Sequence, residues 1–423
     1  MWFHYRSVAL WFTMGMPKPA PTLWRHPDFL KLWAGQSISE LGSRITAVGL
    51  PILAAQTLNA TPAQMGLLAA LSGFASLLFG LPIGAWVDRV RRRPVMIGAD
   101  IARAALLATI PLAAGRGMLT LPFLYIVAAL TGVLTICFDV AYQSYVPSLV
   151  DRDHVLEANS KLAISAATAE VAGPAITGVL IEWISAPLAI LWDAVSFLCS
   201  AVSVSLLRRP EPPPDPHPED SNFLAGILAG LHFLWTHRGL RALAGRSATI
   251  YLFFGFFGSL YMLYGLRELK MSASLLGIVI ATGGIGNMFG ALYAARLAGR
   301  FGIRRTLLYS SSAIALAFTL IPLASGSVLR EAAFLIGAQV FGDCAIVICT
   351  TNELSFRQQV TPENRLGRVN SAMQILSLGV APLGALGAGF IAEAIGLRSA
   401  IAIAVAGIWL SNVWLLNFPG EPA

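Results

Sequence analysis

Charged residues are scarce in this sequence: Asp, Glu, Lys and Arg together make up 12% of the 423 residues. A soluble globular protein carries about 25% charged residues, so this chain has too few to cover a surface that faces water. A soluble enzyme of two or three domains is therefore nearly excluded, and we expect the chain not to be an enzyme.

Lysine and cysteine are rarer still. None of the four lysines follows a glycine, so the chain has no Walker A loop and cannot bind ATP in that way. The four cysteines lie inside apolar stretches without metal-ligand spacing, which gives no support to a disulfide or a metal site. We therefore expect no metal and no cofactor, and uphill work would have to draw on an ion gradient or an outside partner.

Apolar residues dominate instead, at 56% of the chain with a mean hydropathy of +0.69. Twelve membrane helices of ~20 residues would need about 240 apolar residues, which is close to what the chain contains. We predict an all-α membrane protein with twelve transmembrane helices. The predicted spans are 30–57, 62–87, 94–114, 119–147, 158–183, 187–207, 243–266, 271–298, 304–325, 331–356, 370–395 and 398–418.

The distribution of Lys and Arg predicts the orientation of these spans. With the N-terminus in the cytoplasm, five of the 29 basic residues fall in outside loops, three fall within spans, and the rest are cytoplasmic. The outside five are Arg116, Arg267, Lys270, Arg330 and Arg398, and the three within spans are Arg44, Arg103 and Arg246. We predict a multi-pass protein of the inner membrane with both termini cytoplasmic. The net charge of +7 then reflects topology and not nucleic-acid binding.

The first residues do not read as a signal peptide, because their apolar stretch is short and broken and no small-residue cleavage site precedes Pro17. A cytoplasmic or interfacial segment over 1–28 is the preferred interpretation. Translation that starts at Met14 or Met16 is the alternative.

The two halves of the chain repeat at an offset of 211 residues. His26 matches His237 and Glu182 matches Glu393, and the same offset relates further Gly, Arg and Asn-Ser positions. Because 211 residues hold six spans, the halves share one orientation and form two pseudo-symmetric six-helix bundles. We predict an N-terminal bundle at 29–207, a cytoplasmic linker with an interfacial helix at 208–242, and a C-terminal bundle at 243–423.

A glycine and an aspartate precede an arginine cluster between the second and third spans. The residues are Gly84, Asp88, Arg89, Arg92 and Arg93, and we predict that they form a gate. A glycine lets helices approach closely, an aspartate can face the positive end of another helix, and the arginines can pair with carboxylates. The alternative is that the cluster only reflects the basic character of inside loops, but the spacing of Gly and Asp favours the gate.

This segment closely resembles the G-x-x-x-D-R-x-x-R-R signature of the major facilitator superfamily. Four further segments resemble the macrolide-efflux and enterobactin-exporter-like branch: FLKLWAGQ at 29–36, YVPSLV at 145–150, EANS at 157–160 and GPAITG at 173–178. The resemblance covers nearly the whole chain. It implies a twelve-helix fold with alternating access, export of amphipathic compounds against protons, and spans 1, 4, 7 and 10 lining the cavity.

The resemblance also implies that the segment between the second and third spans packs near Asn370 and Ser371 when the cavity opens outward. Gly173, Pro174 and Gly178 resemble in part the antiporter motif of the fifth span. A helix kink with close packing explains these three residues equally well. The resemblance fails at two points. Ala128, four residues before Gly132, stands where drug antiporters often carry an arginine, and Ser43 stands where the branch often has an acidic residue. The proton site must therefore be argued from this chain's own charges.

Polar residues form stripes on two spans. Gln36, Glu40 and Arg44 share one face of the first span, and Asp139 and Gln143 continue a stripe of threonines on the fourth. Glu40 and Asp139 lie at similar depth, about halfway through the membrane. A charge in the bilayer costs ~2.5–3.5 kcal/mol, which favours a role in transport. The alternative is a structural network that pairs Glu40 with Arg44, and Asp139 with Arg103 or the loop arginines.

A shorter stripe on span 10 contains Gln339 and Asp343, for which functional and structural roles have equal weight. Arg246 lies near a helix end, and we expect its side chain to extend toward the membrane interface. Asp100, Glu170 and Asp193 are interpreted as packing or gating groups. The predicted substrate and proton pathway therefore consists of Glu40, Arg44, Asp139, Gln143 and Asp343.

We predict a monomeric, proton-coupled exporter of small amphipathic molecules, such as macrolide-like drugs or siderophore-like metabolites. Arg44 lies one turn from Glu40 and stabilises its charge, so Asp139 is the better candidate to carry the proton and Glu40–Arg44 to contact polar parts of the substrate. The alternative is a proton- or sodium-coupled importer of a small metabolite. A receptor or assembly partner that does not transport is disfavoured, because buried charges on cavity helices would serve no purpose there.

Overall fold

A computed structural model describes residues 23–87, 89–211, 223–416 and 418–419 of the chain. Every regular element in these ranges is a helix, and twelve helical segments are long and apolar enough to cross a membrane. The predicted all-α fold and the predicted number of spans are confirmed. The greater part of the predicted N-terminal segment, the core of the linker and Asp88 lie outside the described residues.

The N-terminal bundle contains the first six spans, each a single helix. They are α2 (Pro27–Gln56), α3 (Pro62–Val87), α4 (Arg92–Gly115), α5 (Leu121–Leu149), α6 (Val155–Ile184) and α7 (Ala186–Ser205). Two short 3₁₀ helices, η1 (Leu23–Arg25) and η2 (Arg152–His154), precede α2 and α6. A single residue, Ser185, separates α6 from α7. Its backbone φ of 84° is one that residues other than glycine rarely adopt.

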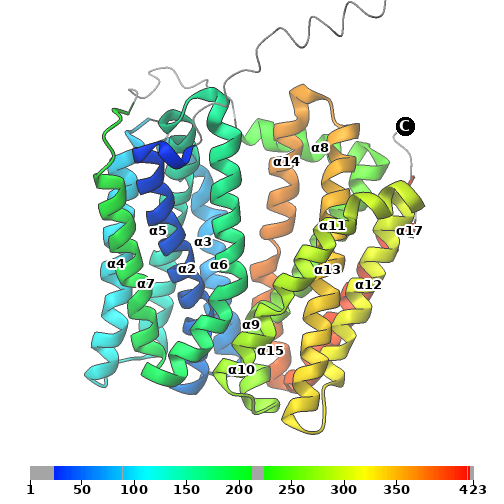
Figure 1. Cartoon of the computed structure of the whole chain (residues 1–423). Coiled ribbons are helices and arrows are strands. Elements are labelled where there is room, and N and C mark those ends of the chain that lie inside the picture. The colour runs from blue at the N-terminus through cyan, green and yellow to red at the C-terminus, as the bar shows by residue number, and fades with distance from the viewer. Residues whose placement is uncertain (1–22, 88, 212–222, 417, 420–423) are drawn as a thin grey trace, which may run out of the picture.

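The C-terminal bundle contains the other six spans, several of which are broken. Its elements are α9 (Arg238–Leu263) with the π-helical turn η3 (Tyr264–Glu268), α10 (Ala273–Ala281), α11 (Gly283–Phe301), α12 (Ile303–Leu323), α13 (Val328–Val360), α14 (Glu363–Leu378), α15 (Ala381–Ile395), α16 (Leu397–Ser411) and α17 (Val413–Leu416). The helix α8 (Phe223–Thr236) precedes them and runs across the end of this bundle (Figure 1).

Most predicted boundaries agree with the structure to within a few residues, but the seventh and eleventh spans begin earlier. α9 starts at Arg238 and α14 at Glu363, although their apolar segments begin several residues later. A helix continues into polar sequence where a cap is available, and here the Nδ1 atom of His237 accepts the backbone N–H of Leu240 at 3.3 Å. Hydropathy detects the apolar segment and misses this extension.

The same cap shows that the predicted repeat is structural. His26, 211 residues before His237, accepts the backbone N–H of Phe29 on its Nδ1 atom at 3.1 Å and precedes α2. The corner after α15 repeats the corner after α6, because Gly396 stands alone between α15 and α16 with φ 90°. The two bundles stand side by side with their spans nearly parallel (Figure 1).

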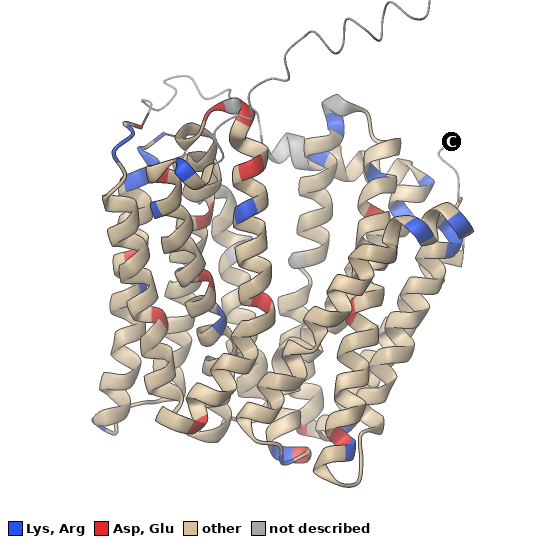
Figure 2. Cartoon of the chain, in the orientation of Figure 1, with Lys and Arg blue, Asp and Glu red and all other residues tan. Residues whose placement is uncertain are grey.

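Basic residues gather at one end of the molecule, at the top of Figure 2. We call it the basic end; it holds the arginines at 91–93, 208–209, 300, 304–305, 357, 365 and 368. The far end is the opposite one, which holds the segments 57–61, 116–120, 269–272 and 324–327. The bundles diverge toward the basic end and meet at the far end (Figure 1).

Candidate functional site: the cavity between the two bundles

Arg44 connects two helices of the N-terminal bundle, α2 and α6. Its Nη1 atom lies 2.5 Å from Oε2 of Glu170 on α6, and its Nη2 atom lies 4.0 Å from Oε2 of Glu40. The predicted Glu40–Arg44 pair is therefore present but secondary to a pair that the sequence did not indicate. Glu170 has been interpreted as a packing or gating group, and the structure makes it the main partner of Arg44.

Gly173 explains why α2 and α6 come close enough for this pair. A Cβ atom added at Gly173 would lie 2.4 Å from the Cβ atom of Arg44. Only a glycine leaves room for the stem of Arg44, and Glu170 lies three residues before it on the same helix face. All three charged side chains of this group remain between 35% and 54% exposed, so water or substrate can reach them.

Asp139 and Gln143 on α5 are both exposed, and the structure gives neither a hydrogen bond nor an ion pair among the described residues. The alternative pairing of Asp139 with Arg103 is not present, because Arg103 forms its ion pair with Asp100 on the same helix. Glu40 and Arg103 are the charged groups whose fields act most strongly on Asp139 from nearby helices. Asp139 is thus an accessible carboxyl group close to Glu40, as the sequence predicts from their matching depth.

Asp343 of α13 belongs to the C-terminal bundle, and its carboxylate lies where Gly283 has no side chain. A Cβ atom added at Gly283 would lie 2.0 Å from Oδ2 of Asp343. Glu170 acts on Asp343 electrostatically across the bundle interface, and the buried hydroxyl of Tyr261 nearby has no hydrogen-bond partner in the described part of the chain. The space between the bundles therefore carries carboxylates from both sides around one arginine.

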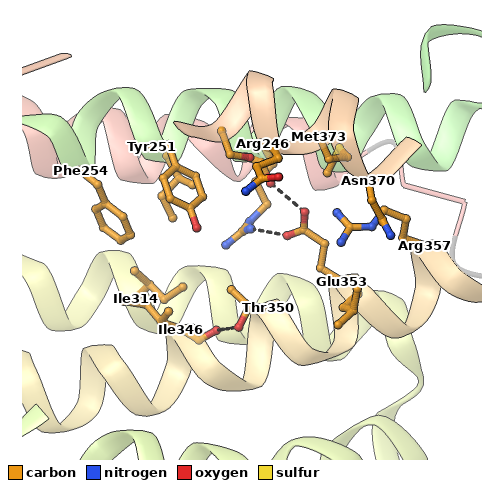
Figure 3. Close-up of a pocket in the computed structure, with 15 residues that line it drawn as sticks. Arg246, Tyr251, Phe254, Ile314, Ile346, Thr350, Glu353, Arg357, Asn370 and Met373 are labelled. Carbon is orange, nitrogen blue, oxygen red and sulfur yellow. Dashed lines mark hydrogen bonds and ion pairs between the residues drawn. The ribbon is translucent and has the colours of Figure 1, made fainter. Parts of the chain in front are cut away.

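A second group of charges lies nearer the basic end, in a cavity of about 370 Å³ lined by α9, α12, α13 and α14 (Figure 3). Arg246 of α9 is 2% exposed, so the expectation that it extends toward the interface is wrong. Its Nη1 atom donates to Oε2 of Glu353 on α13 at 3.1 Å, and its Nε atom donates to the hydroxyl of Ser311 at 3.0 Å. The hydroxyl of Ser247 donates to the other carboxylate oxygen of Glu353 at 2.8 Å.

Sequence reasoning missed Glu353 as the partner of Arg246. The two residues are 107 positions apart on different spans, and no motif links them. One signal was present: each lies about two turns inside its helix, since Arg246 is ~12 Å from the start of α9 and Glu353 ~10 Å from the end of α13 at 1.5 Å per residue. Opposite charges at matching depth on two cavity-lining spans predict a pair.

The gating segment is described in part. A Cβ atom added at Gly84 would meet nothing within 4 Å, so the close helix approach expected there does not occur in this conformation. The backbone N–H groups of Arg92 and Arg93, which begin α4, donate to the carboxylate of Glu211 at 2.6 and 3.2 Å. A carboxylate at a helix N-terminus is favoured by the helix dipole. Arg89 is exposed, and Asp88 lies outside the described residues.

Gly178 and Pro174 lie where the bundles meet at the far end. A Cβ atom added at Gly178 would lie 2.4 Å from the carbonyl oxygen of Ala273 on α10. One added at Gly277 of α10 would lie 2.2 Å from the carbonyl oxygen of Pro174. Glycines on both helices thus let α6 and α10 contact each other through backbone atoms.

The helices α3 and α15 repeat this contact on the other side of the molecule. Cβ atoms added at Gly66 and Gly389 would lie 2.5 Å and 2.6 Å from the carbonyl oxygens of Ala385 and Pro62. Each of these four residues lies 211 positions from its counterpart in the α6–α10 contact. The bundles therefore meet at the far end through two symmetry-related contacts, and the cavity lined by Arg246 and Glu353 lies nearer the basic end.

No group of three or more His, Cys, Asp or Glu side chains arranged to hold a metal ion occurs within the described ranges. Glu40 and Glu170 lie beside Arg44, Asp343 lies beside Gly283, and Asp139 is exposed. The arrangement is able to bind and release protons and to hold a polar group of a small molecule.

Comparison with known proteins agrees with this architecture. The sequence model of the Major Facilitator Superfamily matches residues 32–385. The multidrug efflux pump Tap of Mycolicibacterium fortuitum is 26% identical over 417 residues, covering 94% of this chain and 99% of the relative. Macrolide efflux protein A of Streptococcus pyogenes is 26% identical over 381 residues (88% and 90%). The enterobactin exporter EntS of Escherichia coli is 25% identical over 409 residues (91% of each).

Solved structures share the fold. A bacterial homologue of the iron transporter ferroportin in its inward-facing state has a TM-score of 0.74 at 17% identity, covering 95% of this chain and 100% of that one. The outward-facing state of such a homologue has a TM-score of 0.57 at the same identity, covering 93% and 100%. The nucleoside transporter NupG has a TM-score of 0.72 at 14% identity, with coverages of 93% and 100%.

Proposed function

This chain belongs to the Major Facilitator Superfamily, and from that premise we propose that it exports small amphipathic molecules across the cell membrane in exchange for protons. It is a multi-pass membrane protein with relatives that are efflux pumps and exporters. We place the basic end and both termini in the cytoplasm, because Lys and Arg concentrate at the cytoplasmic ends of spans. The cavity then opens to the cytoplasm, where an exporter loads its substrate.

The observation that carries this proposal is the group of charges at the centre of the bundle interface. Glu40, Arg44 and Glu170 form one charged group on the N-terminal bundle, and Glu170 acts electrostatically on Asp343 of the C-terminal bundle. Intramembrane carboxylates that reach a cavity mark ion pathways by default. Asp139, which has no ion partner in the described residues, is the group that we assign to the coupled proton.

Alternating access requires the far end to open and the basic end to close. In this state the far end is closed by backbone contacts at glycines, and opening it requires α6 to leave α10 and α3 to leave α15. The segment with Gly84, Asp88, Arg89, Arg92 and Arg93 would close the basic end in the opposite state, beside Asn370 and Ser371. We propose that one chain contains the whole pathway and works as a monomer in the bilayer.

The test is Asp139→Asn in proteoliposomes, with a compound that a drug and siderophore susceptibility panel in a pump-deficient host identifies. The variant should lose accumulation driven by a proton gradient and keep exchange down the substrate gradient, because the amide mimics the protonated carboxyl group. Asp153→Asn, at an exposed position in η2, is the matched control and should retain both activities.

An Asp139→Asn protein that still concentrates substrate would remove this residue from the coupling step. The direction of transport is read separately in inverted vesicles. There, substrate added to the outside of the vesicle should dissipate an imposed proton gradient if the protein is an antiporter. Proton movement together with the substrate would instead indicate an uptake symporter.

A further inference from the structure

The cavity in Figure 3 carries more positive than negative charge. Arg246 and Arg357 line it together with one carboxylate, Glu353. Both oxygens of that carboxylate already accept hydrogen bonds, one from Arg246 and one from Ser247. The charge of Glu353 is thus compensated within the protein, and the charge of Arg357 is not matched by an ion pair anywhere in the described part of the chain.

Donors in this cavity are left without acceptors. The Nε atom of Arg357 is buried and has no hydrogen-bond partner among the described residues. Arg246 uses Nε and Nη1, which leaves its Nη2 group available. In Figure 3 the Arg246 guanidinium lies between Tyr251 and Glu353, while Arg357 and Asn370 lie on the other side of Glu353. A buried donor without an acceptor is costly, so such a site favours a ligand that supplies one.

One wall of the same cavity is apolar. Tyr251 and Phe254 of α9 face Ile314 and Ile346 across it (Figure 3). Phe254 is fixed by the ring of Phe318, whose centroid lies 5.4 Å away. A cavity with convergent polar groups at one side and aromatic and aliphatic side chains at the other suits a ligand with one polar group and an apolar body.

We propose that this cavity binds the anionic group of an amphipathic substrate through Arg246 and Arg357, with the apolar body of the substrate against Tyr251, Phe254 and Ile314. The inference rests on the proposed transport function and adds the charge of the substrate to it. A guanidinium binds a carboxylate, phenolate, phosphate or sulfonate with charge-assisted hydrogen bonds. A cationic compound would meet two arginines here and a carboxylate that is already bonded.

The test is equilibrium binding to the full-length protein in lipid nanodiscs, with no ion gradient. The probes are 2-naphthoate, 2-naphthylmethylammonium and 2-naphthamide, which share an aromatic body and differ in charge, and empty nanodiscs correct for partition into lipid. We expect 2-naphthoate to bind at least about 10-fold more tightly than the ammonium compound, because each charge-assisted bond contributes about one power of ten or more.

Three variants assign the effect to the cavity. Arg357→Gln should weaken 2-naphthoate binding by about 10- to 100-fold and leave binding of 2-naphthamide within about 3-fold. Arg246→Gln combined with Glu353→Gln should do the same without leaving Glu353 unpaired, which guards against loss of folding. Arg296→Gln, at an exposed arginine of α11 outside the cavity, is the matched control and should retain wild-type affinity for all three probes.

Three results would overturn the inference: no saturable binding of 2-naphthoate, equal affinity for the anion and the cation, or an unchanged anion affinity in Arg357→Gln. Each of these can occur in a protein that exports another class of compound. If the proposed transport function is wrong, the result is different: the protein binds 2-naphthoate and loses that binding in the arginine variants, but it transports no substrate.

Discussion

Among the described residues, each bundle buries one arginine–carboxylate pair within its spans, and the two pairs differ in their surroundings. In the N-terminal bundle Arg103 and Asp100 lie three residues apart on α4, at 3% and 0% exposure. The rings of Phe138 and Phe197 cover the Arg103 guanidinium at 4.6 and 4.0 Å from their centroids. In the C-terminal bundle Arg246 and Glu353 join two helices, α9 and α13, and border the cavity of Figure 3.

The exposed fraction does not separate these pairs, because both arginine side chains are 3% exposed. The two pairs differ in what surrounds the guanidinium group of the arginine. The Arg103 guanidinium is sandwiched between aromatic rings, whereas Arg246 has a free Nη2 group at a cavity that holds other polar side chains. A buried charge in a membrane helix therefore indicates a binding role when it borders a cavity, and a packing role when aromatic side chains enclose it.

The first way to break this comparison is to remove one arginine at a time. Arg103→Gln should destabilise the protein by about 3–5 kcal/mol, because it leaves the buried carboxylate of Asp100 without a partner. Arg246→Gln should cost less, since water in the cavity can reach Glu353. Thermal unfolding of the purified variants in one detergent measures both effects. The double variant Arg103→Gln/Asp100→Asn is the control and should recover part of the loss.

Equal losses for the two single variants would contradict the distinction between an enclosed pair and a cavity pair. A larger loss for Arg246→Gln would reverse it and make the C-terminal pair the structural one.

At the far end we expect the two bundles to behave alike, in contrast to the two buried ion pairs. Gly178→Val and Gly389→Val each place side-chain atoms where a backbone oxygen now lies 2.4–2.6 Å from the added Cβ. Each should prevent closure and shift the population toward a state that is open at the far end by a similar amount. Gly387→Val, where the added Cβ meets nothing within 4 Å, should not.

Spin labels at Met118 and Leu329, which are 66% and 82% exposed at the far end, report this shift as a longer distance between the bundles. The labels go into a background in which the four native cysteines are replaced. A shift with Gly178→Val and none with Gly389→Val would show that the two contacts do not share the closure.

The smallest effect concerns the equivalent one-residue corners after α6 and α15, where the two bundles have different residues. Ser185 and Gly396 both adopt a positive φ, of 84° and 90°, which costs a residue with a Cβ atom ~1–2 kcal/mol and glycine very little. Ser185→Gly should raise stability by about 1 kcal/mol, and Gly396→Ser should lower it by a similar amount. Thermal unfolding is again the measurement. Ser185→Ala, which keeps the Cβ atom, should give no gain, and a gain as large as that of Ser185→Gly would exclude backbone strain as the cause.

The scaffold could be predicted from sequence because it depends on regularities that are local or periodic. Span number follows from hydropathy, and the offset of 211 residues places His26 and His237 as equivalent caps. The matching depth of Asp139 and Glu40 followed from helical rise, and the expectation that both face the cavity followed from the family resemblance. These properties need no knowledge of which helix packs against which.

The pairings were harder to predict. Matching depth makes Arg246 and Glu353 candidates, but which residues pair depends on how the helices rotate against each other. Arg44 pairs with Glu170 since Gly173 brings α6 onto α2, and nothing in the spacing of α2 indicates that glycine as a partner. Arg246 pairs with Glu353 across 107 residues, and its position near a helix end favoured an interfacial side chain instead. A glycine in a neighbouring span decides the Arg44–Glu170 contact, and its effect becomes visible only in three dimensions.

The closure of the far end has a consequence for how this protein can diversify. The contacts at Gly66, Gly178, Gly277 and Gly389 are made with carbonyl oxygens, which every amino acid has in the same place. None of these four glycines lines the cavity that holds Arg246 and Arg357. Substitutions among the cavity side chains therefore leave the joining surface of the closed state unaltered. New specificities can arise in the cavity while the conformational cycle is inherited intact.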